Sequence, residues 1–302
     1  SLHDALPILD SATLGDQVAA LPGLLRDPVT LAKGLRLRAG LLRRGVPVHQ
    51  GVRVLQASGA LDAPARGLSQ APQGAGQRVA AITWHDGQRE HQLACDAICF
   101  GHTLRSETQL ADLLGCDFAF DALQRAHLPL RDAAGRSSVP GVYLAGDGAG
   151  VRGADAAEAA GERAALALLA DRGVAVDAAR ADQLERQLAR STRLRESLEQ
   201  AFPFPEAWAA QAPDELLLCR CEEITVGQLR QTARECGADE LNRAKALCRV
   251  GMGRCQGRYC GAAAAEVLAQ AVGVPIAQVG RLRAQAPIKP IPMALALPDE
   301  AA

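Results

Sequence analysis

The sequence predicts an α/β fold followed by a short, cysteine-rich helical domain. Three observations support this: helical and strand patterns alternate over roughly the first hundred residues, a short apolar stretch at 142–145 runs into Gly-Asp-Gly and a helix, and two cysteine pairs flank helical patterns after residue 213. A chain of 302 residues with 48% hydrophobic residues can bury several cores.

Composition excludes some classes of function. The formal net charge is -1, and the arginines are scattered among acids, so we expect no nucleic-acid partner. The longest apolar run, 164–170, is far shorter than the roughly 20 residues that a membrane span needs. Without a membrane span or a secretory signal, we expect a cytoplasmic protein with reduced thiols, so the nine cysteines are ligands or bystanders.

The N-terminus has an unusual sequence. The first residue is Ser rather than Met, and residues 1–8 resemble a translated sequencing adapter. We expect residues 1–9 to be artefactual or disordered, and the chain to be N-terminally truncated.

Residues 10–100 are predicted to be the remnant of a pyridine-nucleotide-type α/β domain. An amphipathic helix is expected from Leu14 to Arg44, followed by a strand in 46–59. Two further strands, 78–87 and 90–101, are expected to join around Asp86-Gly87.

Residues 101–175 are predicted to be the C-terminal part of a second α/β domain. A helix over 106–115 with Ser106 as its cap is expected first, then a strand at Val142–Ala145. Gly146, Asp147 and Gly148 follow, before a helix over 154–170. This order places Asp147 at the carboxyl end of a parallel sheet, where open α/β sheets bind ligands.

The rest of the chain is predicted to comprise three parts. Residues 176–212 are a helical linker, residues 213–275 the cysteine-rich domain, and residues 276–302 a proline-rich extended tail.

Four cysteines are candidate metal ligands: Cys219 and Cys221 form a C-x-C pair, and Cys255 and Cys260 a C-x4-C pair. Four thiolates can hold zinc or an iron–sulfur cluster, and the sequence leaves open a domain with no metal. Two helices are expected between the pairs and a third after them. Glycine gives the loop the freedom to aim its sulfurs at one centre, at positions Gly251, Gly253, Gly257 and Gly261. The remaining cysteines are predicted to be helix or core fillers: Cys95, Cys99, Cys116, Cys236 and Cys248.

Two expected signatures are absent from the sequence. No G-x-G-x-x-G follows a strand, so no phosphate-cradling dinucleotide loop is present. The six histidines are isolated from any nucleophile, so we assign no catalytic residue.

Two motifs resemble known families. The C-x-C and C-x4-C arrangement, with its sequence GMGRCQGRYC, resembles the bacterioferritin-associated-ferredoxin-like 2Fe-2S domain, which implies a cluster on the four cysteines. The sequence VYLAGDGAG resembles the second flavin-binding motif of two-dinucleotide-fold flavoproteins. That likeness implies that Asp147 binds the ribityl chain of FAD beside Gly146 and Gly148. Gly161 is expected to allow close packing of the following helix on the sheet.

Together with AICFGHTLRSETQLADLLGC, LCRCEE and KPIP, these motifs make residues 10–302 similar to the C-terminal two-thirds of the FAD- and 2Fe-2S-binding α subunits of heteromeric amine-oxidising dehydrogenases. Opine oxidase, D-hydroxyproline dehydrogenase and hydrogen cyanide synthase belong to this group.

The resemblance implies an electron-transfer subunit that works with a catalytic, flavin-bearing β subunit and a small third subunit on an amino acid, imino acid or opine. This chain, with its incomplete FAD site, would be inactive alone. The alternatives are a scaffold subunit with a vestigial FAD fold, and an NAD(P)H-dependent FAD oxidoreductase.

Overall fold

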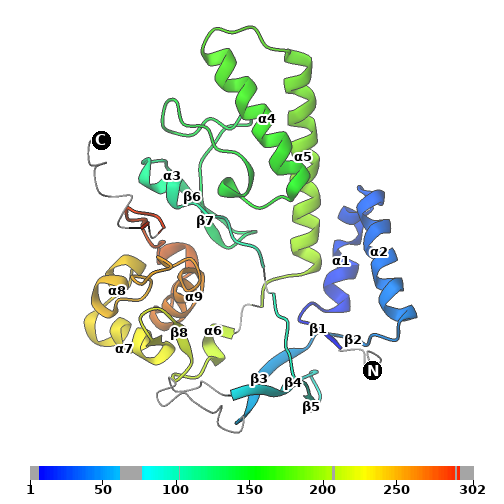
Figure 1. Ribbon diagram of the computed structural model, residues 1–302, viewed down its shortest axis with the longest axis vertical. Coiled ribbons are helices and arrows are strands. Elements are labelled where there is room, and N and C mark those ends of the chain that lie inside the picture. The colour runs from blue at the N-terminus through cyan, green and yellow to red at the C-terminus, as the bar shows by residue number, and fades with distance from the viewer. Residues whose placement is uncertain (1–6, 62–76, 102, 206–207, 290, 293–302) are drawn as a thin grey trace, which may run out of the picture. The chain divides into compact units, whose positions relative to one another are not determined.

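The computed structural model divides into two compact units, one made of residues 1–103 and 193–205 and the other of 104–192 and 206–302 (Figure 1). It describes residues 7–61, 77–101, 103–205, 208–289 and 291–292. The predictions for residues 1–6 and for the end of the tail therefore lie outside the described residues. Residues 8 and 9 belong to a strand, so the expectation of disorder up to residue 9 is wrong for them.

The first unit begins with two helices where the sequence predicts one. Helix α1 (Leu14–Leu24) and helix α2 (Pro28–Arg43) are separated at Asp27. The carboxylate of Asp27 accepts a hydrogen bond from the Thr30 N–H at 3.0 Å, which caps α2. Pro28, which has no N–H to donate, starts a new helix better than it continues the old one.

The strands of the first unit form two small sheets. Strand β1 (Ile8–Asp10) pairs in parallel with β2 (Val48–Gln50), and β4 (Gln77–His85) lies between β3 (Arg53–Leu61) and β5 (Glu90–Ala94) in an antiparallel sheet. Gly51, at φ +67°, divides the predicted strand 46–59 into β2 and β3.

The predicted hairpin at Asp86-Gly87 is confirmed. The Asp86 carboxylate accepts hydrogen bonds from the N–H groups of Gln88 and Arg89 at 2.8 and 2.9 Å. The predicted strand is wrong beyond Ala94: the Cys95 N–H still donates to the carbonyl oxygen of Ala80 in β4 at 3.0 Å, but residues 96–101 belong to no strand. Phe100, near the end of this stretch, is 85% exposed.

The second unit begins with a short helix and a hairpin. Helix α3 (Gln109–Leu113) is shorter than predicted and follows Thr108, so the prediction of Ser106 as its cap is wrong. Strands β6 (Phe118–Asp121) and β7 (Ala126–Pro129) form the hairpin. Its turn is held by Arg105, whose guanidinium donates to the carbonyl oxygens of Gln124 and Arg125 at 2.6 and 3.2 Å.

The predicted strand at Val142–Ala145 is wrong. In this stretch only Tyr143 forms a bridge, with Arg136, and no parallel strand of the described chain lies beside it. The segment pairs only with the short turn before it: the Ser137 N–H donates to the Val142 carbonyl oxygen at 3.0 Å, and the Leu144 N–H to that of Gly135 at 2.7 Å. These isolated antiparallel contacts do not build a strand.

A 3₁₀ turn, η1 (Gly146–Ala149), and the long helix α4 (Ala154–Asp171) follow that segment, and the helix agrees with the prediction. The charged helix α5 (Ala178–Ala201) then runs beside α4, as Figure 1 shows. The two helices are joined by a small core of alanines and leucines: Ala156, Ala159, Ala160, Leu184 and Leu188. Small residues on α4 let α5 approach closely.

Residues 208–282 fold into the cysteine module, drawn yellow to red-orange in Figure 1. Its elements are α6 (Trp208–Gln211), β8 (Leu217–Cys219), β9 (Ile224–Thr225), α7 (Val226–Cys236), α8 (Leu241–Cys248), α9 (Gly261–Val272) and η2 (Ile276–Gln278). The three predicted helices, α7, α8 and α9, are confirmed.

Local sequence explains where the module's helices begin and end. Thr225 and Gln228 form a reciprocal capping box at the start of α7, and Gly237 and Gly273 end α7 and α9 in the left-handed conformation. The helices enclose fully buried apolar side chains: Val226, Leu229, Leu241, Val267 and Leu268. Nowhere in the described chain is there a helix with both the length and the apolar character needed to cross a bilayer.

Candidate functional site

The four candidate ligand cysteines lie at the ends of elements rather than inside them. Cys219 is the last residue of β8 and is buried, while Cys221 lies exposed in the turn that follows. Cys255 lies half-buried in the loop before α9, and Cys260 is buried at the N-cap of that helix. Both pairs therefore sit on short loops anchored by regular structure.

The fold brings the two cysteine pairs together. The side chain of Cys221 lies close enough to that of Cys255 to affect its pKa, and the side chain of Cys219 lies equally close to that of Cys260 in this sense. Each contact joins one member of the upstream pair to one member of the downstream pair, across more than thirty residues of sequence.

These contacts shift the pKa values of the downstream thiols in opposite directions. Burial, followed by the charge and hydrogen bond of Cys219 and the charge of Cys255, raises the pKa of Cys260. For Cys255, burial also acts to raise the pKa, but hydrogen bonds from the Tyr259 N–H and from Cys221 outweigh it, so its pKa is lowered. Thiolates crowded in this way repel one another unless a cation is placed among them.

Glycine is required where the cysteine loop, residues 251–257, packs against Cys221 and Leu282. A Cβ on Gly253 would overlap the Cβ of Cys221 and lie 2.9 Å from a carboxylate oxygen of Glu222. Gly251 and Gly257, at φ +79° and +78°, both face the side chain of Leu282, which leaves no room for a Cβ. The loop between the cysteines is thus held close to both Cys221 and the tail.

The described residues contain no group of three or more His, Cys, Asp or Glu side chains arranged to hold a metal ion. The interactions among the four cysteines join Cys221 to Cys255, Cys219 to Cys260, and Cys255 to Cys260. Their residue types and mutual proximity still fit the donor set of a thiolate-bound cluster, because four cysteines are the usual ligands of such a group.

The other cysteines are placed differently from one another. Cys248 packs against the core of the cysteine module and Cys116 is buried, as expected of fillers. The prediction is wrong for Cys236 and Cys99, which are exposed, and Cys95 is only half-buried. Cys236 ends α7 and Cys99 lies outside any strand, so neither sulfur fills a core in the described chain.

The second candidate site is the loop from Gly146 to Gly148. Gly146 adopts φ +62°, and a Cβ there would lie 3.4 Å from the Cβ of Ala157 in the first turn of α4. Asp147 is exposed on this turn, and within the described chain its carboxylate has no hydrogen-bond partner. The expected position at the end of a parallel sheet is absent from the described chain, because Val142–Ala145 forms no strand.

The role expected for Gly161 is also wrong. It lies exposed on α4, and a Cβ there would meet nothing within 4 Å. Close helix-to-sheet packing needs a sheet opposite this face, and none of the described strands provides one.

Side chains that the sequence motifs did not identify connect the two candidate sites. The Glu107 carboxylate accepts a hydrogen bond from the Arg258 guanidinium, which also donates to the carbonyl oxygen of Cys255 at 3.2 Å. The carbonyl oxygen of Glu107 lies 3.5 Å from where a Cβ on Gly148 would be. Glu107 therefore contacts both the Asp147 loop and the cysteine loop.

Further polar contacts attach the cysteine module to α3 and the β6–β7 hairpin. Arg125 forms a two-bond ion pair with Glu266 of α9, at 3.0 and 2.9 Å, and Glu266 is only 7% exposed. Asp112 accepts hydrogen bonds from Arg281 and from the Ala284 N–H, each at 2.6 Å. Burial alone would raise the pKa of Asp112, but these two donors hold it below its ordinary value.

Comparison with known proteins also separates the cysteine module from the rest of the chain. Residues 217–298 match the family described as the sarcosine oxidase A3 domain. The chain is 34% identical over 297 residues to the A subunit of opine oxidase from Rhizobium meliloti, which covers 96% of the chain and 52% of the relative. It is 30% identical over 290 residues to the HcnB subunit of hydrogen cyanide synthase from Pseudomonas aeruginosa, covering 94% of the chain and 60% of the relative.

A solved structure shows the same fold. The match with the L-proline dehydrogenase from P. horikoshii covers 88% of this chain and 48% of the dehydrogenase chain, with a TM-score of 0.63 and 20% sequence identity. The chain spans about half the length of the curated relatives it matches.

Proposed function

The chain is a relative of the opine oxidase A subunit and of the HcnB subunit of hydrogen cyanide synthase, and from this premise we propose that it is an electron-transfer subunit of a heteromeric dehydrogenase. Its substrate class is an amino acid, imino acid or opine, oxidised at a carbon–nitrogen bond. The relatives are oxidoreductase subunits, which supports the general reaction class.

The observation that carries the proposal is the meeting of four cysteines in two cross-pairs within residues that match the A3 domain. Cys219, Cys221, Cys255 and Cys260 would hold a 2Fe-2S cluster. Burial of Cys219 and Cys260 excludes water from one side of the site, which favours a cluster that is retained rather than exchanged. Zinc would fit four thiolates equally well in number, so metal analysis is part of the test.

Asp147 and the first turn of α4 would hold FAD. The exposed carboxylate, which has no partner among the described residues, can accept hydrogen bonds from the hydroxyl groups of a polyol, and the start of an 18-residue helix favours an electron-rich group. When bound, the flavin exchanges electrons in pairs or singly and the cluster carries them singly, which explains why one subunit would hold both.

The chain's own residues would position these two groups. Glu107 and Arg258 join the Asp147 loop to the cysteine loop, and Arg125 with Glu266 holds the module against the hairpin. Rigid contacts of this kind fix the separation between two redox sites. No proton transfer by this subunit is needed, since the carbon–nitrogen bond would be oxidised on a catalytic, flavin-bearing partner subunit.

A scaffold subunit with a vestigial flavin fold is the second candidate. The irregular backbone at Val142–Ala145, where the flavin-binding motif would need a strand, favours it. A scaffold would bind the catalytic partner without carrying electrons.

The test is to produce the chain together with a flavin-bearing catalytic subunit and to purify the complex. Iron, acid-labile sulfide, zinc and flavin are then measured, and the complex is mixed anaerobically with candidate amino acids and opines. The proposal predicts substrate-dependent bleaching of the cluster's visible absorption. A complex that reduces a dye with substrate while this chain contains neither iron nor flavin would instead establish the scaffold role.

A further inference from the structure

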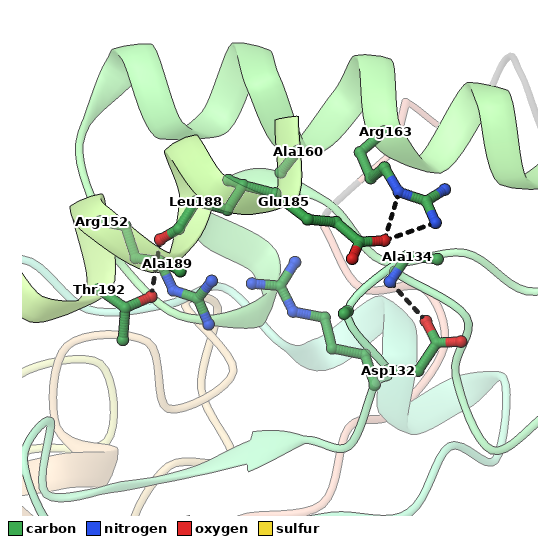
Figure 2. A pocket seen from close by; sticks show the side chains of 12 residues that line it. Asp132, Ala134, Arg152, Ala160, Arg163, Glu185, Leu188, Ala189 and Thr192 are labelled. Atoms are coloured by element: carbon green, nitrogen blue, oxygen red, sulfur yellow. Dashed lines mark hydrogen bonds and ion pairs between the residues drawn. The ribbon is translucent and has the colours of Figure 1, made fainter. Parts of the chain in front are cut away.

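A cavity of about 290 Å³ lies between α4, α5 and the turn at residues 131–135 (Figure 2). Three arginines and two acids line it: Arg131, Arg152, Arg163, Asp132 and Glu185. Its volume is at the small end of the range for ligand pockets, roughly 300–1,000 Å³.

Both acids of the cavity wall are already occupied. Glu185 accepts two hydrogen bonds from Arg163, at 2.8 and 2.7 Å. Asp132 accepts from the N–H groups of Ala134 and Arg136 at 2.9 and 2.8 Å, and from the Arg136 guanidinium at 3.2 Å. Figure 2 shows Glu185 joined to Arg163, with the guanidinium of Arg152 lying apart from both.

Two positive charges in the cavity therefore have no acid partner among the described residues. Arg131 donates one hydrogen bond, to the carbonyl oxygen of Leu144 at 3.0 Å. Arg152 has neither a hydrogen bond nor an ion pair within the described part of the chain. Burial, and after it the charge of Arg152, lowers the pKa of Arg131 to about 10, so the two guanidinium groups are close enough to repel each other.

We infer that this cavity binds a phosphoryl group, held between Arg131 and Arg152. A guanidinium presents parallel N–H donors that match the oxygens of such a group, and a phosphate or diphosphate carries enough negative charge to neutralise both arginines. A single carboxylate would neutralise only one of them.

A second, small pocket shares lining residues with the cavity and suggests two sources of that group. Arg131 and Arg152 also line a small pocket with Gly146, Asp147 and Ala157 of α4. The phosphoryl group could thus belong to a flavin dinucleotide anchored at Asp147 or to a separate small ligand. The first source rests on the proposed function, whereas the anion site itself does not.

The test measures binding of inorganic pyrophosphate to the 302-residue chain by isothermal titration calorimetry. Saturable binding of one pyrophosphate is expected, weakened at least about tenfold in Arg152→Gln because one charge-assisted contact is lost. Arg131→Lys should bind pyrophosphate with an affinity between those of the unaltered chain and Arg152→Gln, since lysine keeps the charge but lacks the planar guanidinium. The matched control is Arg172→Gln, which removes an exposed arginine just beyond the C-terminal end of α4.

Thermal unfolding provides a second readout that does not depend on the calorimetry. Without anion, Arg152→Gln should unfold at a higher temperature than the unaltered chain, because a like-charge contact is relieved. Pyrophosphate should raise the unfolding temperature of the unaltered chain and of Arg172→Gln, but not that of Arg152→Gln.

Absence of saturable binding, or equal affinity in Arg152→Gln and Arg172→Gln, would overturn the inference. Competition with FAD identifies the source: displacement of pyrophosphate by FAD assigns the group to the dinucleotide, and simultaneous binding assigns it to a separate ligand. If pyrophosphate binds through Arg152 and FAD does not bind at all, the flavin proposal fails while the anion site stands.

Discussion

Replacing Arg125 by Met should leave the carboxylate of Glu266 on α9 without its charged partner. Glu266 is 7% exposed and Arg125 20% exposed, and two hydrogen bonds join them. Breaking a buried ion pair from one side costs about 3–5 kcal/mol. Because water reaches part of Arg125, we expect the lower end, about 3 kcal/mol, or roughly 100-fold in the folding equilibrium.

The assay is urea unfolding followed by tryptophan fluorescence. The chain has two tryptophans, so Trp84→Phe leaves Trp208, which packs against the core of the cysteine module, as the only reporter. Arg136→Met is the matched control, because Arg136 and its partner Asp171 are both exposed and their ion pair should contribute little.

Removing both charges separates the buried-charge cost from the loss of packing. The double variant Arg125→Met with Glu266→Met should recover most of the stability lost in Arg125→Met, since no carboxylate is then left buried. A loss below about 1 kcal/mol in Arg125→Met, or no recovery in the double variant, would refute the reasoning. Either result would mean that solvent reaches Glu266.

Three further predictions concern local contacts. Gly253→Ala should lower the amount of cluster retained after reconstitution, measured by visible absorption, because its Cβ would overlap Cys221; Gly34→Ala, which meets nothing within 4 Å, is the control and should retain it. Thr225→Ala should cost the module about 1 kcal/mol in urea unfolding through loss of the capping box, and an unchanged midpoint would contradict this. Because the pKa of Asp112 is lowered in the folded chain, its contribution to stability is present above the ordinary carboxyl pKa of about 4 and is lost as pH falls through the lowered value. Asp112→Asn should therefore be less stable at neutral pH and should lose less stability on acidification; parallel curves for the two proteins would count against the assignment.

The cysteine module could be predicted from sequence because its signals are local. Helices α7, α8 and α9 have regular apolar spacing and strong caps, and the C-x-C and C-x4-C pairs fall on the loops between elements. The glycines of the cysteine loop marked the tight turn, and Gly253 lies against Cys221 as such a turn requires. The ligand set itself stays a prediction.

The predictions that failed depend on neighbours that sequence does not specify. Val142–Ala145 has the composition of a strand but no described strand lies beside it, and the apolar stretch at 96–101 likewise forms no strand in the described chain. Gly161 was assigned to a sheet contact that requires the same missing neighbour. Periodicity reports which residues could pair, whereas pairing depends on what the fold places alongside.

The contacts between the two candidate sites have no signature in the sequence. Glu107 and Arg258 are separated by 151 residues, and Arg125 and Glu266 by 141. Each is an ordinary charged residue in its local context, and only the tertiary fold brings the partners together. The cavity that holds Arg131 and Arg152 also has no signature in the sequence, because its three walls come from separate segments of the chain.

The most direct test of the central claim is anaerobic reconstitution of the chain with iron and sulfide, followed by metal analysis and visible spectroscopy of six cysteine-to-serine variants. The proposal predicts two irons and two sulfides per chain, as a 2Fe-2S cluster requires. It predicts loss of the cluster in the variants at Cys219, Cys221, Cys255 and Cys260, and its retention in those at Cys236 and Cys248, which lie at the ends of α7 and α8. Stoichiometric zinc without iron, or loss in the Cys248 variant with retention in the Cys260 variant, would contradict it.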